Sequence, residues 1–259
     1  SRVWLMLGTM DVRSRYRRTT LGPFWVSISM AVQATVTALV PNLRFDPQRE
    51  LQMIMHNTAT PNVMAVFPGL PIKSVSDLIA HARKNPATLH YGSSGVGTSL
   101  HLAGALLESM TGAKLVHLPF KGVDQATVAT IGGESQIIIH NSAPMLPHVK
   151  AGHVRGIAVT STTRSRLAPE LPTIAEAGVV DYEFVSWYAV VAPAQTPAAV
   201  IARLNAEFNR AMQAPEIVAR TQAEDMDVRR GSPRALDEAR AAMVAKWSKI
   251  VRATGIQAD

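Results

Sequence analysis

The sequence has no cysteine among its 259 residues. The protein therefore cannot form a disulfide, use a thiol nucleophile or bind a metal through thiolates. It also lacks the His-Glu-x-x-His pattern by which two histidines on one helical face hold zinc. These absences exclude several enzyme classes, and we expect neither a metal nor another cofactor. They leave the compartment open, because both cytoplasmic and periplasmic proteins can lack cysteine.

A concentrated basic surface is also missing. The net charge is +7, but five arginines against Asp11 place +4 of it in the first 18 residues. The remaining +3 is spread over the rest of the chain and forms no stripe of the kind that binds nucleic acid. Hydrophobic residues make up 47% of the sequence, which is enough for the core of one large domain or two smaller ones.

The N-terminal part differs from the rest. The stretch from Leu21 to Val40 has no charged residue, and its length is that of a membrane-crossing helix. With the basic residues before it and the small residues Val36, Thr37 and Ala38 near its end, it also resembles a secretory signal. A third interpretation is a helix packed on the main body. Membrane contact through this segment is therefore one expectation.

Residues 11–25 also resemble the amphipathic entry and first membrane helix of polysaccharide-exporting ABC permeases, a likeness that ends near residue 35. A permease needs several further membrane helices, and no second apolar run of about 18 residues follows. We interpret the segment as a fused fragment and not as a sign of sugar export.

From residue 41 the pattern is that of an α/β protein. Apolar runs at 51–56 and 62–67 predict two strands separated at Pro61, and Ser74 with Asp77 predicts a capped helix over 74–84. Predicted strands (88–91, 114–117, 136–140, 156–160) then alternate with predicted helices (98–111, 123–131, 143–151), and this alternation favours a parallel sheet. The last part of the chain predicts a return to another lobe. It contains a predicted long strand over 182–192, followed by predicted helices over 197–212, 214–223 and 233–253.

The most informative loop follows the strand at 88–91. It differs by one residue from each of three known motifs. Thr98 replaces the Lys of a phosphate-binding P-loop, Leu100 replaces the third Gly of a dinucleotide-binding fingerprint, and Val96 replaces the second Gly of a nucleophile elbow. What remains is a set of hydroxyls and free amides at a helix start, which suits an anion such as a carboxylate. The alternative is an ordinary turn with Thr98 or Ser99 as the N-cap.

Ligands of parallel sheets bind at the carboxyl ends of the strands. The neighbouring loops at that edge contribute Lys121, Asn141 and the hydroxyls of residues 161–163. Lys121 is the only charged group in this set, so the lining suits an acid. A solvated loop lysine and a helix-capping Asn141 are the alternatives.

From about residue 40 to residue 256 the chain resembles the Bug (TctC-type) extracytoplasmic solute receptors of tripartite tricarboxylate transporters. The likeness rests on residues 45–47, 61–63, 89–104, 116–122, 158–161, 171–178 and 186–188. It implies an α/β, two-lobed periplasmic-binding-protein-like fold with parallel sheets and a cleft that closes on a small carboxylate or related metabolite. It also implies a periplasmic, non-catalytic protein that works with the membrane components of a tripartite transporter.

The resemblance divides the chain into residues 1–40, a first lobe from 41–70 and 190–259, and a second lobe over 71–189. It implies a ligand site made of Ser93, Ser94, Gly95, Gly97, Thr98, Ser99, Lys121, Gly122 and Asn141. The family's first strand and Pro-Gly-Gly loop have no counterpart here. We therefore expect an incomplete first lobe and weak or absent ligand binding by this chain alone, because one wall of the cleft is missing.

Two other functions stay open at this point. One is a hydrolase that uses Ser94 with His101 or His117 as the base, although no motif places a carboxylate beside either histidine. The other is a membrane-anchored partner protein that uses residues 21–40 as its anchor.

Overall fold

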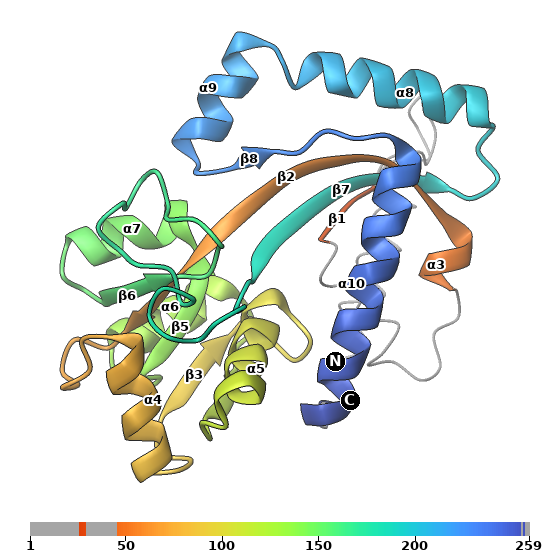
Figure 1. The fold of residues 1–259 in the computed structure, drawn as a ribbon. Helices are drawn as coiled ribbons and strands as arrows, with labels where there is room; N and C mark the ends of the chain where they lie inside the picture. The colour runs from red at the N-terminus through yellow and green to blue at the C-terminus, as the bar shows by residue number, and fades with distance from the viewer. Residues whose placement is uncertain (1–25, 30–45, 255, 257–259) are drawn as a thin grey trace.

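The computed structural model describes residues 26–29, 46–254 and 256. The described part contains two β-sheets, which share one long strand, and helices on both faces of each (Figure 1). An α/β fold of this kind was expected from the sequence.

The shared strand is β2, Leu51–Val66. Its first part pairs antiparallel with β7 (Val185–Pro193), and its last part pairs antiparallel with β5 (Ile137–Asn141) and β6 (Arg155–Val159). The prediction of two strands separated at Pro61 was wrong. Pro61 is the last residue of β2 that pairs with β7, so its missing amide falls where the strand changes partners and costs little.

The first sheet consists of β1 (Val26–Ser29), β7, β2 and β8 (Asp227–Val228), all antiparallel. The second sheet has the order β6, β2, β5, β3 (His90–Ser93), β4 (Val116–Pro119). Among the named strands, β3 pairs parallel with its two neighbours β4 and β5. The expectation of parallel sheets thus holds only for that part, because β2 enters the second sheet in the opposite direction.

Helices cover both faces of the second sheet. α4 (Val75–Lys84) and α5 (Ser99–Thr111) share a core with Met64 of β2 and Tyr91 of β3. α6 (Val123–Ile131) and α7 (Ser142–Lys150) share the other core with Ala65. The predicted cap of α4 is present, since the Ser74 hydroxyl accepts a hydrogen bond from the amide of Asp77.

Three C-terminal helices, α8 (Ala198–Ala211), α9 (Pro215–Ala223) and α10 (Pro233–Thr254), complete the described structure. α8 covers one face of the first sheet over Ile54, and α10 covers the other over Met53 (Figure 1). α10 then continues to the second core, where Trp247 meets Phe184 edge to face. α9 lies between α8 and β8, and the short α3 (Pro47–Glu50) precedes β2.

The uncharged N-terminal stretch contributes strand β1. Val26 pairs with Val191 and Ser29 with Tyr188, so these four residues are extended, and the prediction of a continuous helix over residues 21–40 was wrong for them. β-branched residues in this stretch favour a strand at a free sheet edge. Both the stretch at 21–40 and the fragment that resembles a permease include β1. Their other residues lie outside the described residues. No helix in the described ranges has the length and apolar character needed to span a membrane.

Candidate ligand-binding site

The predicted ligand loops meet at one edge of the second sheet. Because β3 runs parallel to β4 and β5, the carboxyl ends of all three strands lie together, and α5, α6 and α7 begin there. The amide of Phe120 donates to the carbonyl of Ser93 at 2.8 Å, which joins the first two loops directly. The backbone thus brings Ser93 to Ser99, Lys121, Gly122 and Asn141 to a common edge.

The Ser93 to Ser99 loop is held by its own hydrogen bonds. The Ser93 hydroxyl is buried and accepts from the Gly95 amide at 3.0 Å, and the Thr98 hydroxyl donates to the Gly95 carbonyl at 2.8 Å. Gly95 and Gly97 have φ values of 128° and 75°, which side chains rarely adopt. The glycines are therefore needed for the shape of the loop.

Much of this loop remains accessible. Ser94, Gly95, Gly97, Thr98 and Ser99 are half-buried, whereas Ser93 has no exposed surface. Ser93 supports the loop from below, and the other five residues can present groups to a ligand.

Three helix starts at this edge lack a side-chain cap. Thr98, Gly122 and Asn141 occupy the N-cap positions of α5, α6 and α7. Neither the Thr98 nor the Asn141 side chain accepts a hydrogen bond from its helix, and Gly122 has no side chain. α3 and α4 are capped by Asp46 and Ser74, whereas α8 and α9, which begin elsewhere, also lack a side-chain cap. The first-turn amides of an α-helix have no intrahelical acceptor, so this edge offers donors and positive potential to an anion.

The Asn141 side chain is anchored by two hydrogen bonds. Its amide nitrogen donates to the Tyr188 hydroxyl at 3.3 Å, and its oxygen accepts from Ser186 at 3.0 Å. Ser186 is also within 3.2 Å of the Asn62 oxygen, so β2, β5 and β7 are linked by polar side chains where the two sheets meet. Asn141 thus joins the ligand edge to the strand that crosses between the sheets. The motif at 186–188 formed part of the family resemblance, but nothing in the sequence predicted this contact.

Two histidines lie directly beneath the loop. The His101 Nδ1 accepts from the Gly97 amide at 3.0 Å, and the His117 Nε2 forms a hydrogen bond with the Ser93 hydroxyl. The two rings are stacked with centroids 3.7 Å apart. Burial lowers the pKa of His101 to about 4, and burial together with the neighbouring His101 lowers the pKa of His117 to about 3.

A third histidine has a similar role at the next loop. The His140 Nδ1 accepts from the Asn141 amide at 2.8 Å, and burial lowers the pKa of His140 to about 4. All three imidazoles are therefore neutral at pH 7. From the sequence, His101 and His117 are candidate bases of a hydrolase, with a packed or capping histidine as the alternative for His101, and its burial and its hydrogen bond to Gly97 agree with that alternative. The hydroxyl that contacts His117 belongs to buried Ser93 and not to Ser94, so the proposed Ser94 pairing is not formed.

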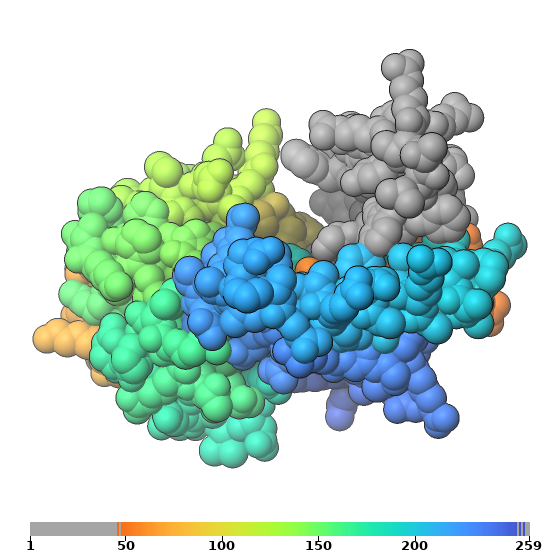
Figure 2. Space-filling model, turned by 90° about the horizontal axis from the view of Figure 1, so that it is seen from above, coloured from red at the N-terminus to blue at the C-terminus, as the bar shows by residue number. Residues whose placement is uncertain are grey.

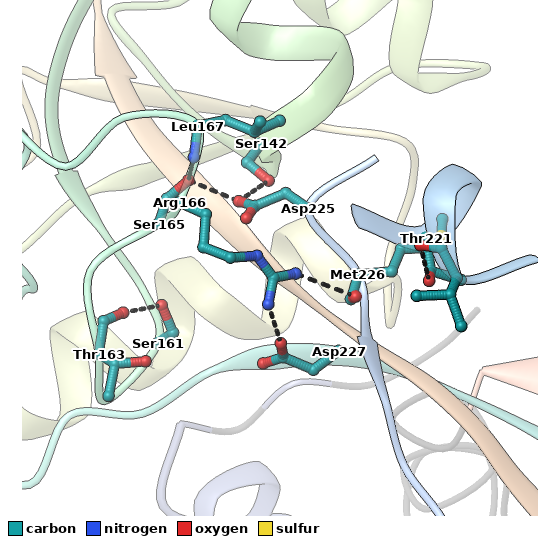
Figure 3. A network of polar contacts seen from close by, with 11 residues as sticks. Ser142, Ser161, Thr163, Ser165, Arg166, Leu167, Thr221, Asp225, Met226 and Asp227 are labelled. Atoms are coloured by element: carbon teal, nitrogen blue, oxygen red, sulfur yellow. Dashed lines mark hydrogen bonds and ion pairs between the residues drawn. The ribbon is translucent and has the colours of Figure 1, made fainter. Parts of the chain in front are cut away.

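A carboxylate from the C-terminal part of the chain reaches the start of α7. Asp225, which is 2% exposed, accepts hydrogen bonds from Ser142 at 2.7 Å and from Ser165 at 2.6 Å (Figure 3). Arg166 forms an ion pair with Asp227 at 2.9 Å beside it. Figure 2 shows the blue atoms of this C-terminal region directly against the green atoms of the α7 region. The segment after α9 is thus attached to the residue that follows Asn141.

No group of three or more potential metal-ligating side chains occurs in the described ranges.

Comparison with known proteins gives consistent results. The model of the tripartite tricarboxylate transporter family receptor matches residues 17–256. A UPF0065 protein of Pseudomonas sp. strain P51 is 32% identical over 212 residues, and Protein BugT of Bordetella pertussis is 30% identical over 233 residues. These matches cover 82% and 89% of this chain, which spans 63% and 71% of the two relatives.

A solved structure titled as R. palustris Rpa4515 with adipate has a TM-score of 0.84 and 29% identity, and the match covers 96% of this chain and 83% of that one. The structure of the periplasmic binding protein BugD has a TM-score of 0.79 at 22% identity, covers 90% of this chain and 78% of that one, and supports the fold alone. The periplasmic-binding-protein fold is thereby confirmed. On the extent of the family match, the chain belongs to the tripartite tricarboxylate transporter receptor (TctC) family.

Proposed function

We propose that this chain is an extracytoplasmic solute-binding protein that captures a small carboxylate for a tripartite tricarboxylate transporter. The observation that carries the proposal is the meeting of three uncapped helix starts at one edge of the second sheet. Their free amides and dipoles favour a carboxylate. Family membership and the adipate bound by a relative at 29% identity support the same class of ligand.

In this proposal the ligand contacts come from Ser94, Gly95, Gly97, Thr98 and Ser99, with Lys121, Gly122 and Asn141 from the neighbouring loops. Ser93 supports the loop and does not touch the ligand, because its side chain is buried. The exposed Lys121 supplies the positive charge.

The lobes proposed from the sequence are residues 41–70 with 190–259 and residues 71–189. The strand pairings favour crossings nearer Pro61 and Val185, where β2 passes from one sheet to the other, and the proposed cleft lies there. The periplasm and the membrane components of a transporter are the proposed location and partners.

The test uses NMR because it reports ligand binding at individual residues. The chain is labelled with ¹⁵N-glycine, and adipate is added to about 10 mM, well above a Kd on the order of 1 mM. We expect the signals of Gly95, Gly97 and Gly122 to shift in a saturable way, while those of Gly152 and Gly178, outside the loops, stay fixed. Uncharged adipamide is the matched ligand control.

Lys121→Gln should weaken adipate binding about tenfold, and Lys150→Gln, at the opposite end of α7, should leave it unchanged. The proposal is overturned if linear C4 to C6 dicarboxylates all leave the three loop glycines unchanged. It is also overturned if adipamide shifts the signals as strongly as adipate does.

A further inference from the structure

The stacked histidines His101 and His117 lie beneath the candidate loop. The function proposed above assigns no role to either of them. They come from different elements, His101 from α5 and His117 from β4, yet their rings are parallel to within 3°. Each also makes one hydrogen bond to the loop. They therefore join the loop to the sheet below it.

The hydrogen bond to Gly97 requires one particular form of His101. Because the backbone amide can only donate, the His101 Nδ1 must carry a lone pair, which leaves the single proton of the neutral ring on Nε2. A proton on Nδ1 would place two donors against each other at 3.0 Å. The amide of Gly97 would then lose its acceptor, and the loop would have to move.

The stack adds a second constraint. With ring centroids 3.7 Å apart, the two rings cannot both carry a charge without strong repulsion in a buried site. In the described ranges, the titratable group of another residue that faces both rings is Tyr91 of β3, 6.1 Å from His101 and 5.1 Å from His117. Burial raises the pKa of Tyr91, so this phenol stays neutral.

Nearby acids do not offset a charge on the pair. Glu108, about two turns along α5 from His101, accepts from the amide of Leu115, and its electrostatic effect falls on Tyr91. Burial is the cause of the lowered pKa of His101, and no ionisable side chain described on β5 or α10 contributes to it. The pair therefore depends on its own neutrality.

We propose that His101 and His117 are positioning residues that hold the Ser93 to Ser99 loop in its ligand-binding shape only as neutral imidazoles, and that protonation of the pair releases the loop. The part of this inference that concerns the ligand rests on the proposed function. The part that concerns the loop does not, and it can be measured without any ligand.

The sequence supplies a direct probe of the loop. Val96-Gly97 is the only Val-Gly pair in the chain, so labelling with ¹³C-carbonyl valine and ¹⁵N-glycine selects the Gly97 amide alone. The ligand-free chain is titrated from pH 7 to about 3.5, and circular dichroism defines the range over which it stays folded. We expect the hydrogen-exchange protection of Gly97 to fall about tenfold with a midpoint well below pH 6, together with protonation of His101 in the ¹⁵N-histidine spectrum.

Two variants separate the acceptor from the ring. His101→Phe keeps an aromatic ring but has no acceptor, so Gly97 should have lost its protection already at pH 7. His101→Asn places an oxygen near the Nδ1 position and cannot be protonated, so Gly97 should keep its protection over the whole range. His153→Gln, on an exposed histidine, is the matched control and should behave as the parent does. If His101→Phe does not fold, the parent titration against His101→Asn still tests the need for an acceptor at Gly97, because only the parent should lose protection as the pH falls.

The ligand arm uses adipate at pH 7. His101→Phe should weaken its binding about tenfold, while His153→Gln should not. The inference is overturned if Gly97 keeps its protection through protonation of His101, or if His101→Phe and His101→Asn give the same result. If no dicarboxylate binds the parent chain but Gly97 responds as expected, the proposed function fails and the positioning role of the pair stands.

Discussion

The buried carboxylate of Asp225 allows a prediction of how much free energy of unfolding is lost when a buried polar contact is broken. It is 2% exposed and accepts hydrogen bonds from Ser142 at 2.7 Å and Ser165 at 2.6 Å, both to the same oxygen. We consider Asp225→Asn the cleanest perturbation. Asp225 has φ of 57°, which asparagine tolerates well and alanine does not, so Asp225→Ala would add backbone strain.

The magnitude follows from the kind of hydrogen bond. A hydrogen bond to a charged group contributes about 1.5–3 kcal/mol, and a neutral one about 1 kcal/mol. Asparagine can still accept from both serines through its oxygen, so Asp225→Asn should lower the free energy of unfolding by about 1–3 kcal/mol. Asp225→Ala leaves both buried hydroxyls without this partner and should lower it by about 3–5 kcal/mol.

The assay is urea unfolding followed by circular dichroism. Arg166→Gln is the matched control from the same cluster, because it removes an ion pair to Asp227 whose side chains are 52% and 49% exposed. Such exposed pairs contribute less than about 1 kcal/mol. A double-mutant cycle of Asp225→Asn with Ser165→Ala isolates the coupling between the two side chains.

The reasoning fails if Arg166→Gln costs as much as Asp225→Ala. It fails equally if the cycle gives no coupling, since the hydroxyl and the carboxylate would then not stabilise each other. A loss of cooperativity in Asp225→Ala would also be informative, because the contact joins the C-terminal segment to the second sheet.

Three further predictions concern packing, pH and capping. A methyl group on Gly104 would lie 2.4 Å from the buried ring of Tyr91, so Gly104→Ala should lower the free energy of unfolding by about 1–3 kcal/mol, although alanine has the better helix propensity. Gly132→Ala, with its nearest contact at 3.5 Å, should leave the free energy of unfolding nearly unchanged. Equal urea midpoints for the two variants would contradict this prediction. Folding lowers the pKa of His101 from 6.5 to about 4, so the unfolded chain binds more protons than the folded chain between those pH values, and this residue alone should lower the free energy of unfolding by about 2 kcal/mol from pH 7 to pH 5. In urea unfolding, His101→Asn should lose less stability than the parent over this range, by about that amount. An equal loss in the two proteins would count against a buried neutral ring. Ser74→Ala removes the cap of α4 and should cost about 1 kcal/mol in the same assay, with Ser74→Asp close to the parent; a fully stable alanine variant would show that the cap contributes nothing.

Much of the fold could be predicted from the sequence because its helices carry local signals. The cap at Ser74 and the glycine at 112 mark helix ends that the structure reproduces. The continuity of β2 could not be predicted, since Pro61 normally ends a strand. Only the exchange of partners from β7 to β5 at that residue makes a proline acceptable there.

The candidate site was predictable in position but not in its contacts. The order of strands and helices places the Ser93 to Ser99 loop, Lys121 and Asn141 at one edge. The contacts of Asp225 span 83 and 60 residues, and no local pattern announces them. The neutral state of His101 likewise depends on burial, which the sequence does not reveal.

Since β2 is a member of both sheets, its side chains face four packed layers, and β-bulges between Met53 and Met55 and between His56 and Thr58 adjust the alternation between them. Met53 points to α10 and Ile54 to α8, while further along the strand Met64 points to α5 and Ala65 to α7. Inserting or deleting one residue near the middle of β2 would leave the side chains of one half on their faces of the sheet and move those of the other half to the opposite faces. The spacing between the two halves is thus as strongly constrained as the identity of the residues, and neither half can be lengthened independently of the other.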